Sequence, residues 1–119
     1  MANGEYPTAA IDELVNQRAA LPLEMLIHEM TEVPARMLGL DDRGRLAEGM
    51  IADFVLFETS RTRPGALVAR PDLPGGEARL YSPAEGIAHV FVGGVETISD
   101  GEFTGALPGR LLRSGRDSR

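Results

Sequence analysis

The sequence predicts an α+β fold in which helices come first and a small antiparallel sheet follows. Three observations support this prediction. Apolar residues recur with helical spacing within residues 21–31, a continuous apolar run fills residues 52–57, and two glycine-containing turn signals interrupt the C-terminal third. We therefore divide the chain into three parts: a helical segment at 1–40, a sheet-forming segment at 41–113 with a long loop at 59–86, and a flexible tail at 114–119.

The first 40 residues predict two helices and a further helical turn. Thr8 is placed to cap a first helix that ends near Ala20. The second helix is amphipathic, because its apolar residues lie at positions i, i+3, i+4 and i+7: Leu23, Leu26, Ile27 and Met30. Pro34 should break this helix and leave one more turn, which Gly39 closes in a left-handed conformation.

The apolar run from Ala52 to Phe57 has the length and composition of a strand that is covered on both faces. A short extended piece at residues 45–48 should precede it. Asp53 lies at the mouth of this apolar strand, where a carboxylate must find backbone donors or an arginine. We interpret Asp53 as a structural group that pins the turn around Gly49 to the strand, and a general base is the alternative interpretation.

Residues 59–86 contain four prolines and four glycines, and they predict a long surface loop with at most a short strand at 66–69. Order returns with a hairpin, in which strands at 87–92 and 95–98 flank Gly93-Gly94. That turn requires positive φ angles. Asp100-Gly101 is a second turn signal, so a third short strand is expected at 102–104. The sheet should therefore be a small antiparallel meander.

The composition restricts the partners of the chain. With 119 residues and a net charge of −6, the chain lacks the basic surface that a nucleic-acid partner needs. The last ten residues carry +3, which indicates either a basic patch or, more commonly, a solvated terminus. Cysteine is absent and no apolar run reaches membrane length, so we expect neither disulfides nor a membrane partner, and a cytoplasmic location.

The two histidines are the residues most worth testing as metal ligands or bases. His28 has Glu24 and Glu32 one helical turn away on either side, but this charged face lies opposite the apolar one, so a solvated face with weak ion pairs is favoured. His89 shares a strand face with Ile87 and Phe91. It could be a ligand, but a partly buried ring hydrogen-bonded to backbone is commoner.

Other catalytic constellations are missing or have a simpler explanation. Asp41-Asp42 precedes Gly44 and fits a turn at least as well as a carboxylate pair. All twelve basic residues are arginine, which excludes a lysine base or a Schiff base. The glycines fit no phosphate-binding spacing, and no G-x-S-x-G nucleophile motif is present. The sequence therefore assigns no catalytic, metal-binding or cofactor-binding residue.

Three stretches nevertheless resemble the amidohydrolase superfamily, and in particular its N-acyl-D-amino-acid deacylase (D-aminoacylase) branch. They are residues 21–40, 42–58 and 86–113. The middle stretch contains G-x-L-x-x-G-x-x-A-D before an apolar strand, a pattern shared broadly in the superfamily. The third contains T-G-A-L-P-G-R at 104–110 after D-G-E at 100–102, which points to the D-aminoacylases. The matching positions are scaffold positions: Gly44, Gly49, Ala52, Asp53, Gly93, Gly105, Pro108 and Gly109.

The resemblance implies that the chain is the C-terminal, non-catalytic portion of a metal-dependent hydrolase of linear amides. In such enzymes a (β/α)8 barrel carries the metal site, and a composite β-sandwich lies beside it. The family's metal ligands would precede residue 1, so zinc is expected only for a complete family member and the chain should be inactive alone. The alternative is a self-association module or a subunit of a split hydrolase. The expected partner is another copy or the missing barrel.

Overall fold

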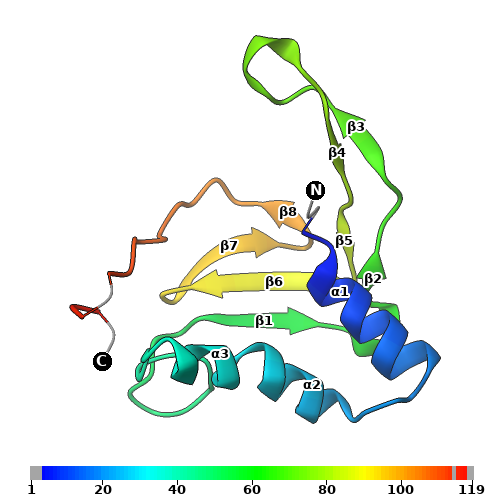
Figure 1. The fold of residues 1–119 in the computed structure, drawn as a ribbon. Coiled ribbons are helices and arrows are strands. Elements are labelled where there is room, and N and C mark those ends of the chain that lie inside the picture. The colour runs from blue at the N-terminus through cyan, green and yellow to red at the C-terminus, as the bar shows by residue number, and fades with distance from the viewer. Residues whose placement is uncertain (1–3, 114, 118–119) are drawn as a thin grey trace.

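The computed structural model describes residues 4–113 and 115–117 of the chain and confirms the α+β prediction. Helices occupy the N-terminal third, and the strands that follow form one four-stranded antiparallel sheet and two short ribbons (Figure 1). The second layer of the expected sandwich stays a prediction. Residues 114, 118 and 119 of the expected tail lie outside the described residues.

The first helix begins earlier than the sequence indicated. Helix α1 (Tyr6–Ala10) runs directly into η1 (Ile11–Gln17), a π-helical segment. Pro7 lies in the first turn, where its missing N–H is not needed. Thr8 is therefore not the cap, and the prediction was wrong on this point. Its buried hydroxyl instead donates to the carbonyl of Glu5, with 3.0 Å between the oxygens.

The predicted amphipathic helix is α2 (Leu23–Met30), and a separate helix α3 (Glu32–Met37) follows it. The break lies at Thr31, which has φ −126° and ψ −73°, and not at Pro34 as expected. Pro34 is the third residue of α3. The N–H groups of the first turn have no partner within the helix, so a proline costs little there. Gly39 follows with φ 68°, as predicted.

The hydrophobic core lies between α1, η1 and α2. Its buried members are Ala10, Ile11 and Leu26, and partly buried residues pack around them: Leu14, Val15, Leu21, Leu23, Ile27, Met30 and Phe57. Phe57 is the last residue of strand β1 (Phe54–Phe57), so the helices are fixed to the sheet at one end of this strand. The core is small, because it depends on one face of each helix and on a single strand end.

The sheet contains β1, β6 (Ile87–Val92), β7 (Val95–Ser99) and β8 (Glu102–Phe103), in the order β1-β6-β7-β8. All neighbouring strands are antiparallel. The predicted meander is confirmed, including the turn at Gly93 and Gly94, whose φ angles are 58° and 80°. The expected extended piece at 45–48 does not form a strand: residue 45 lies in a bend, residues 46–47 are irregular and a turn begins at residue 48.

The expectation that β1 is covered on both faces was wrong for this chain. Val55 is 45% exposed and Leu56 50% exposed, and no residue of the four described strands is fully buried. Phe54 stacks on Phe91 of the neighbouring strand, with ring centroids 4.5 Å apart. Strand β1 thus has the composition of a covered strand, although the residues of this sheet are at most partly buried in the described chain.

The segment predicted as a long loop is a two-stranded arm, which projects away from the sheet (Figure 1). We call residues 63–85 the ribbon arm. Its elements, after the short helix η2 (Thr59–Arg61), are β2 (Arg63–Pro64), β3 (Val68–Arg70), η3 (Pro74–Gly76), β4 (Arg79–Tyr81) and β5 (Ala84–Glu85). β2 pairs with β5 and β3 with β4. β3 overlaps the short strand expected at 66–69, and most of the segment is exposed as a surface excursion would be. The sequence did not indicate the other strands, because strands of two or three residues leave no readable periodicity.

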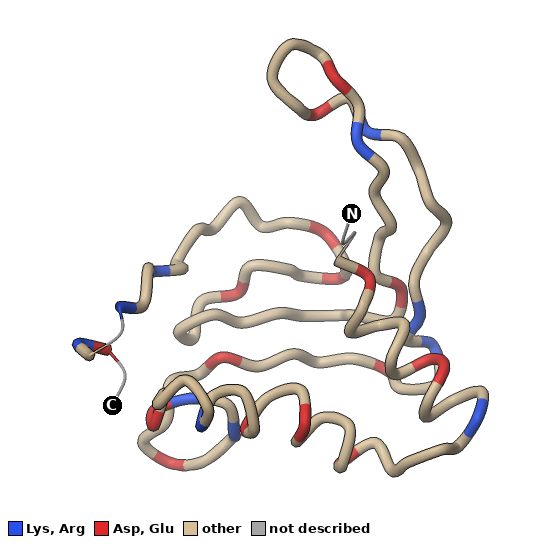
Figure 2. The backbone as a smooth tube through the Cα atoms, in the orientation of Figure 1, with Lys and Arg blue, Asp and Glu red and all other residues tan. Residues whose placement is uncertain are grey.

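Charged residues of both signs are interspersed along the described trace (Figure 2). No described helix combines the length and the apolar character that are needed to cross a membrane.

Candidate functional site

The candidate site is centred on Asp53, which directly precedes β1. One carboxylate oxygen, Oδ2, accepts a hydrogen bond from Nη1 of Arg43 at 3.0 Å, and the other accepts one from the backbone N–H of Gly93 at 2.7 Å. Arg43 is largely buried, and its Nε donates to Asp42 at 3.1 Å. Asp53 therefore joins the 41–53 turn region to the β6–β7 hairpin, 40 residues further along the chain.

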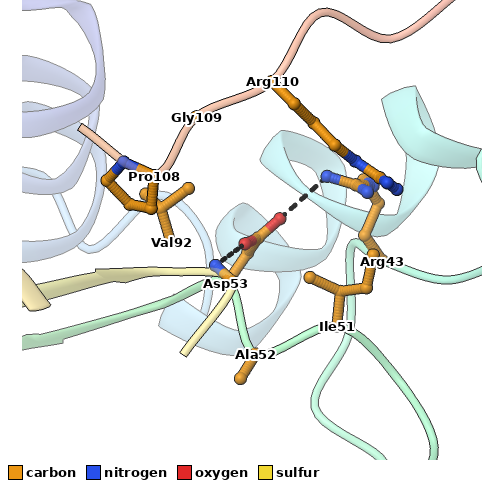
Figure 3. Close-up of a pocket in the computed structure, with 9 residues that line it drawn as sticks. Arg43, Ile51, Ala52, Asp53, Val92, Pro108, Gly109 and Arg110 are labelled. Carbon is orange, nitrogen blue, oxygen red and sulfur yellow. Dashed lines mark hydrogen bonds and ion pairs between the residues drawn. The ribbon is translucent and has the colours of Figure 1, made fainter. Parts of the chain in front are cut away.

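Asp53, Arg43 and Gly93 line an open cavity of about 420 Å³, whose lining residues are drawn in Figure 3. The lining residues are Arg43, Ile51, Ala52, Asp53, Val92, Gly93, Pro108, Gly109 and Arg110. Five of the eight scaffold positions that the sequence indicated are among them: Ala52, Asp53, Gly93, Pro108 and Gly109. The structure thus brings together two motifs that lie more than 50 residues apart in the chain.

The geometry favours a structural role for Asp53 over a role as general base. Both carboxylate oxygens already accept a hydrogen bond, one from a guanidinium and the other from a backbone N–H. The prediction that Asp53 would find backbone donors or an arginine is confirmed, since it accepts one hydrogen bond of each kind. Its partners differ from the expected turn at Gly49, since they are Arg43 and the hairpin turn.

Sequence reasoning missed Arg43 and Arg110 as members of this site. Arg43 stands within the D-R-G turn and Arg110 ends the T-G-A-L-P-G-R stretch, so both were adjacent to residues that had been singled out. Figure 3 labels both arginines among the residues that line the cavity. Asp42 and Asp53 both pair with Arg43. The charged residues that line the cavity are Arg43, Arg110 and Asp53, so its lining carries one net positive charge.

The two histidines lie outside this cavity. His28 is on an exposed helix face and its Nδ1 lies 3.4 Å from Glu32, which confirms the predicted solvated i,i+4 pair. His89 is partly buried, but its Nδ1 bonds Glu96 Oε1 at 2.7 Å and not the backbone. The cause is the sheet register, which places Glu96 on the strand adjacent to His89. The described residues contain no group of three or more His, Asp or Glu side chains that could hold a metal ion.

We expect Asp53→Ala to lower the free energy of unfolding by about 2 kcal/mol, because it leaves a largely buried guanidinium and a backbone N–H without their shared acceptor. Urea denaturation measures this loss. Glu48→Ala removes an exposed carboxylate from the same turn region and should change stability by less than about 0.5 kcal/mol. Equal effects of the two substitutions would show that the Asp53 contacts contribute nothing.

Comparison with known proteins agrees with the shared scaffold. The amidohydrolase family matches residues 2–104, and the chain belongs to this family. It is 35% identical over 109 residues to an N-acyl-D-aspartate deacylase and 35% identical over 106 residues to an N-acyl-D-glutamate deacylase, both of Alcaligenes xylosoxydans xylosoxydans. A D-aminoacylase of the same organism is 33% identical over 91 residues. No solved structure matches the chain.

The three relatives are much longer proteins. The matches cover 91%, 89% and 76% of this chain but only 20%, 20% and 17% of the respective relatives. The chain therefore spans about one fifth of the length of these relatives. The chain is equally identical to the deacylases of two different acidic amino acids, so sequence identity favours neither of the two substrates.

Proposed function

We propose that this chain is the C-terminal, non-catalytic portion of a metal-dependent amidohydrolase of the N-acyl-D-amino-acid deacylase type, and that it is inactive alone. The observation that carries the proposal is the match of nearly the whole chain to about one fifth of the deacylases. The polar groups that could do chemistry are already engaged with each other: Asp53 with Arg43, and His89 with Glu96.

The exposed surface of the chain supports the same proposal. Its accessible area is 8606 Å², whereas a compact monomer of 12.8 kDa exposes about 6,300 Å². Its radius of gyration is 15.9 Å, against about 13.5 Å for a compact domain of 119 residues. The partly open sheet, the projecting ribbon arm and the exposed stretch beyond β8 contribute to this excess, and a larger fold would cover such surfaces.

Zinc, which the family resemblance implies for a complete enzyme, has no fitting donor set among the described residues. Zinc sites require three or four converging nitrogen, sulfur or carboxylate ligands. The ring of His28 lies on an exposed helix face, and that of His89 lies in the sheet with one carboxylate partner. We therefore assign this chain a scaffold role, in which the Asp53 site holds the 42–58 and 86–113 stretches together.

A complementation assay tests the proposal. The complementary fragment is the N-acyl-D-aspartate deacylase of Alcaligenes xylosoxydans xylosoxydans without the fifth of its length that matches this chain. We expect no hydrolysis of N-acetyl-D-aspartate by the chain or the fragment separately, and hydrolysis by their mixture. The intact deacylase is the positive control. Turnover by the chain alone that survives repurification contradicts the proposed inactivity, and failure of the fragment to bind the chain contradicts the proposed scaffold role.

A self-association module is the second candidate, and the outer edge of the sheet favours it. Strand β1 pairs with β6 on one side only, and Val55 and Leu56 are about half exposed. Unprotected edges of this kind recruit other strands. Light scattering at high protein concentration distinguishes the two candidates. A monomer of 12.8 kDa contradicts the self-association module and leaves the proposal that the chain is a portion of a larger enzyme.

A further inference from the structure

The ribbon arm has two chemically different faces. In its antiparallel register Val68 lies opposite Tyr81, Ala69 opposite Leu80, and Arg70 opposite Arg79. Because side chains alternate along a strand, the two arginines share one face with Tyr81, and Ala69 and Leu80 lie on the other face. Continuing the alternation by one residue adds Leu67 to this second face. We call Leu67, Ala69 and Leu80 the apolar face of the arm.

We call the face with Arg70, Arg79 and Tyr81 the arginine face, and both of its guanidinium groups find partners within the arm itself. The guanidinium of Arg79 binds both carboxylate oxygens of Asp72, at 2.8 and 2.9 Å. This hydrogen-bonded pair lowers the pKa of Asp72 below its usual value. Arg70 lies over the ring of Tyr81, with 4.0 Å between its Cζ atom and the ring centroid. These contacts stiffen the ribbon and offset the repulsion between the two arginines that lie opposite each other.

The base of the arm fixes its direction relative to the sheet. Thr62 is fully buried, and its hydroxyl donates to the carbonyl of Glu58 at 2.8 Å. The buried hydroxyl of Ser82 donates to the carbonyl of Gly65, also at 2.8 Å, and β2 packs against α1. The arm is therefore anchored at one end and held in a defined position.

The apolar face, in contrast, contacts nothing that would cover it in the described chain. Leu67 is 57% exposed and Leu80 62% exposed, although an isolated two-stranded ribbon is marginally stable in water. A stiff arm with an anchored base and an open apolar face has the form of an interaction element. It presents a preorganised surface, so little conformational entropy is lost when a partner covers it.

We propose that the apolar face of the ribbon arm docks on the remainder of the amidohydrolase fold, the four-fifths of the relatives' length that this chain does not span. This inference rests on the proposed function. The matched ranges of the family and of the N-acyl-D-aspartate deacylase run through residues 63–85, so the arm lies within the shared region.

The amount and distribution of exposed surface favour this occupant over a second copy of the chain. The excess over a compact monomer is about 2,300 Å², whereas a two-fold dimer of standard size buries about 800 Å² per partner in one patch. Exposed apolar residues occur on the sheet, on the arm and beyond β8, at Val55, Leu80 and Leu107 among others. A body that contacts several faces at once fits this distribution better than one symmetric patch does.

The test compares variants of the full chain for binding to the complementary fragment by analytical ultracentrifugation. Leu80→Ser should weaken binding at least about tenfold, since it removes a leucine from the docked face. Val68→Ser is the matched control, because Val68 lies on the opposite face of the same ribbon and is 43% exposed. We expect this control to bind like the wild type. Circular dichroism should give the same melting temperature for both variants and the wild type.

The possible outcomes separate the two proposals. If the wild type and Leu80→Ser bind the fragment equally well, the arm inference is wrong while the proposed function stands. If Leu80→Ser abolishes association between copies of the chain but leaves fragment binding unchanged, the occupant of the apolar face is a second copy. If the wild type does not bind the fragment, both proposals are overturned.

Discussion

Leu26→Ala should lower the free energy of unfolding by about 3 kcal/mol, in the lower half of the range of about 2–5 kcal/mol for buried leucines. Leu26 is 6% exposed and lies at the centre of the core between α1, η1 and α2. The buried apolar residues among those described are few: Ala10, Ile11, Leu26 and Ala35. Small domains are stable by only about 5–15 kcal/mol, so the loss of one large core side chain should be visible at once.

Met25→Ala is the matched control for this experiment. Met25 precedes Leu26 on the same helix but is 56% exposed, so its truncation should cost less than about 0.5 kcal/mol. Both variants keep helix propensity nearly constant, because alanine replaces a good helix former in each case. Urea denaturation gives the two free energies. Similar losses for both variants would show that α2 does not bury its Leu26 face.

The elements that could be predicted from the sequence are those whose signal is local. The four apolar positions of α2 repeat over two helical turns, and the Gly93-Gly94 pair encodes its hairpin within a few residues. The errors have a local cause as well. Pro34 suggested a helix break, but a proline in the first turn of α3 costs no internal hydrogen bond, so the break moved to Thr31.

For the candidate site, the sequence predicted the chemical type of each partner but not which residue supplies it. A carboxylate beside an apolar strand needs donors, and that argument correctly indicated backbone donors or an arginine for Asp53, which has one of each. It could not identify Arg43 and Gly93, because their positions depend on how β1 pairs with β6. The Glu96 partner of His89 depends in the same way on the register of β6 and β7.

The apolar composition of β1 predicts more burial than this strand has in the described chain. The continuous apolar run at residues 54–57 predicts a strand that is buried on both faces, yet Val55 and Leu56 are about half exposed. Apolar composition on an open face indicates a surface that is covered in a larger fold. The error in the burial prediction therefore agrees with the proposal that this chain is one portion of an amidohydrolase.

Gly86→Ala should destabilise the chain by about 3 kcal/mol and disrupt the base of the ribbon arm. Gly86 has φ +80°, a conformation that costs about 1–2 kcal/mol for a residue with a side chain. An added Cβ would also lie 2.6 Å from the carbonyl carbon of Arg61 and 2.7 Å from the amide nitrogen of Thr62. Both are backbone atoms, so relief requires movement of the chain at the buried Thr62.

Gly75→Ala separates the two contributions, because Gly75 has nearly the same φ of +81° but open space around an added Cβ. We expect this control to cost only the conformational term of about 1–2 kcal/mol. Thermal melts compare the total losses. Hydrogen exchange at the Glu58 amide, which donates to the Gly86 carbonyl at 3.0 Å, reports on the arm base and should accelerate only in Gly86→Ala. Equal losses and equal exchange rates in the two variants would show that the close approach at Gly86 does not hold the arm in place.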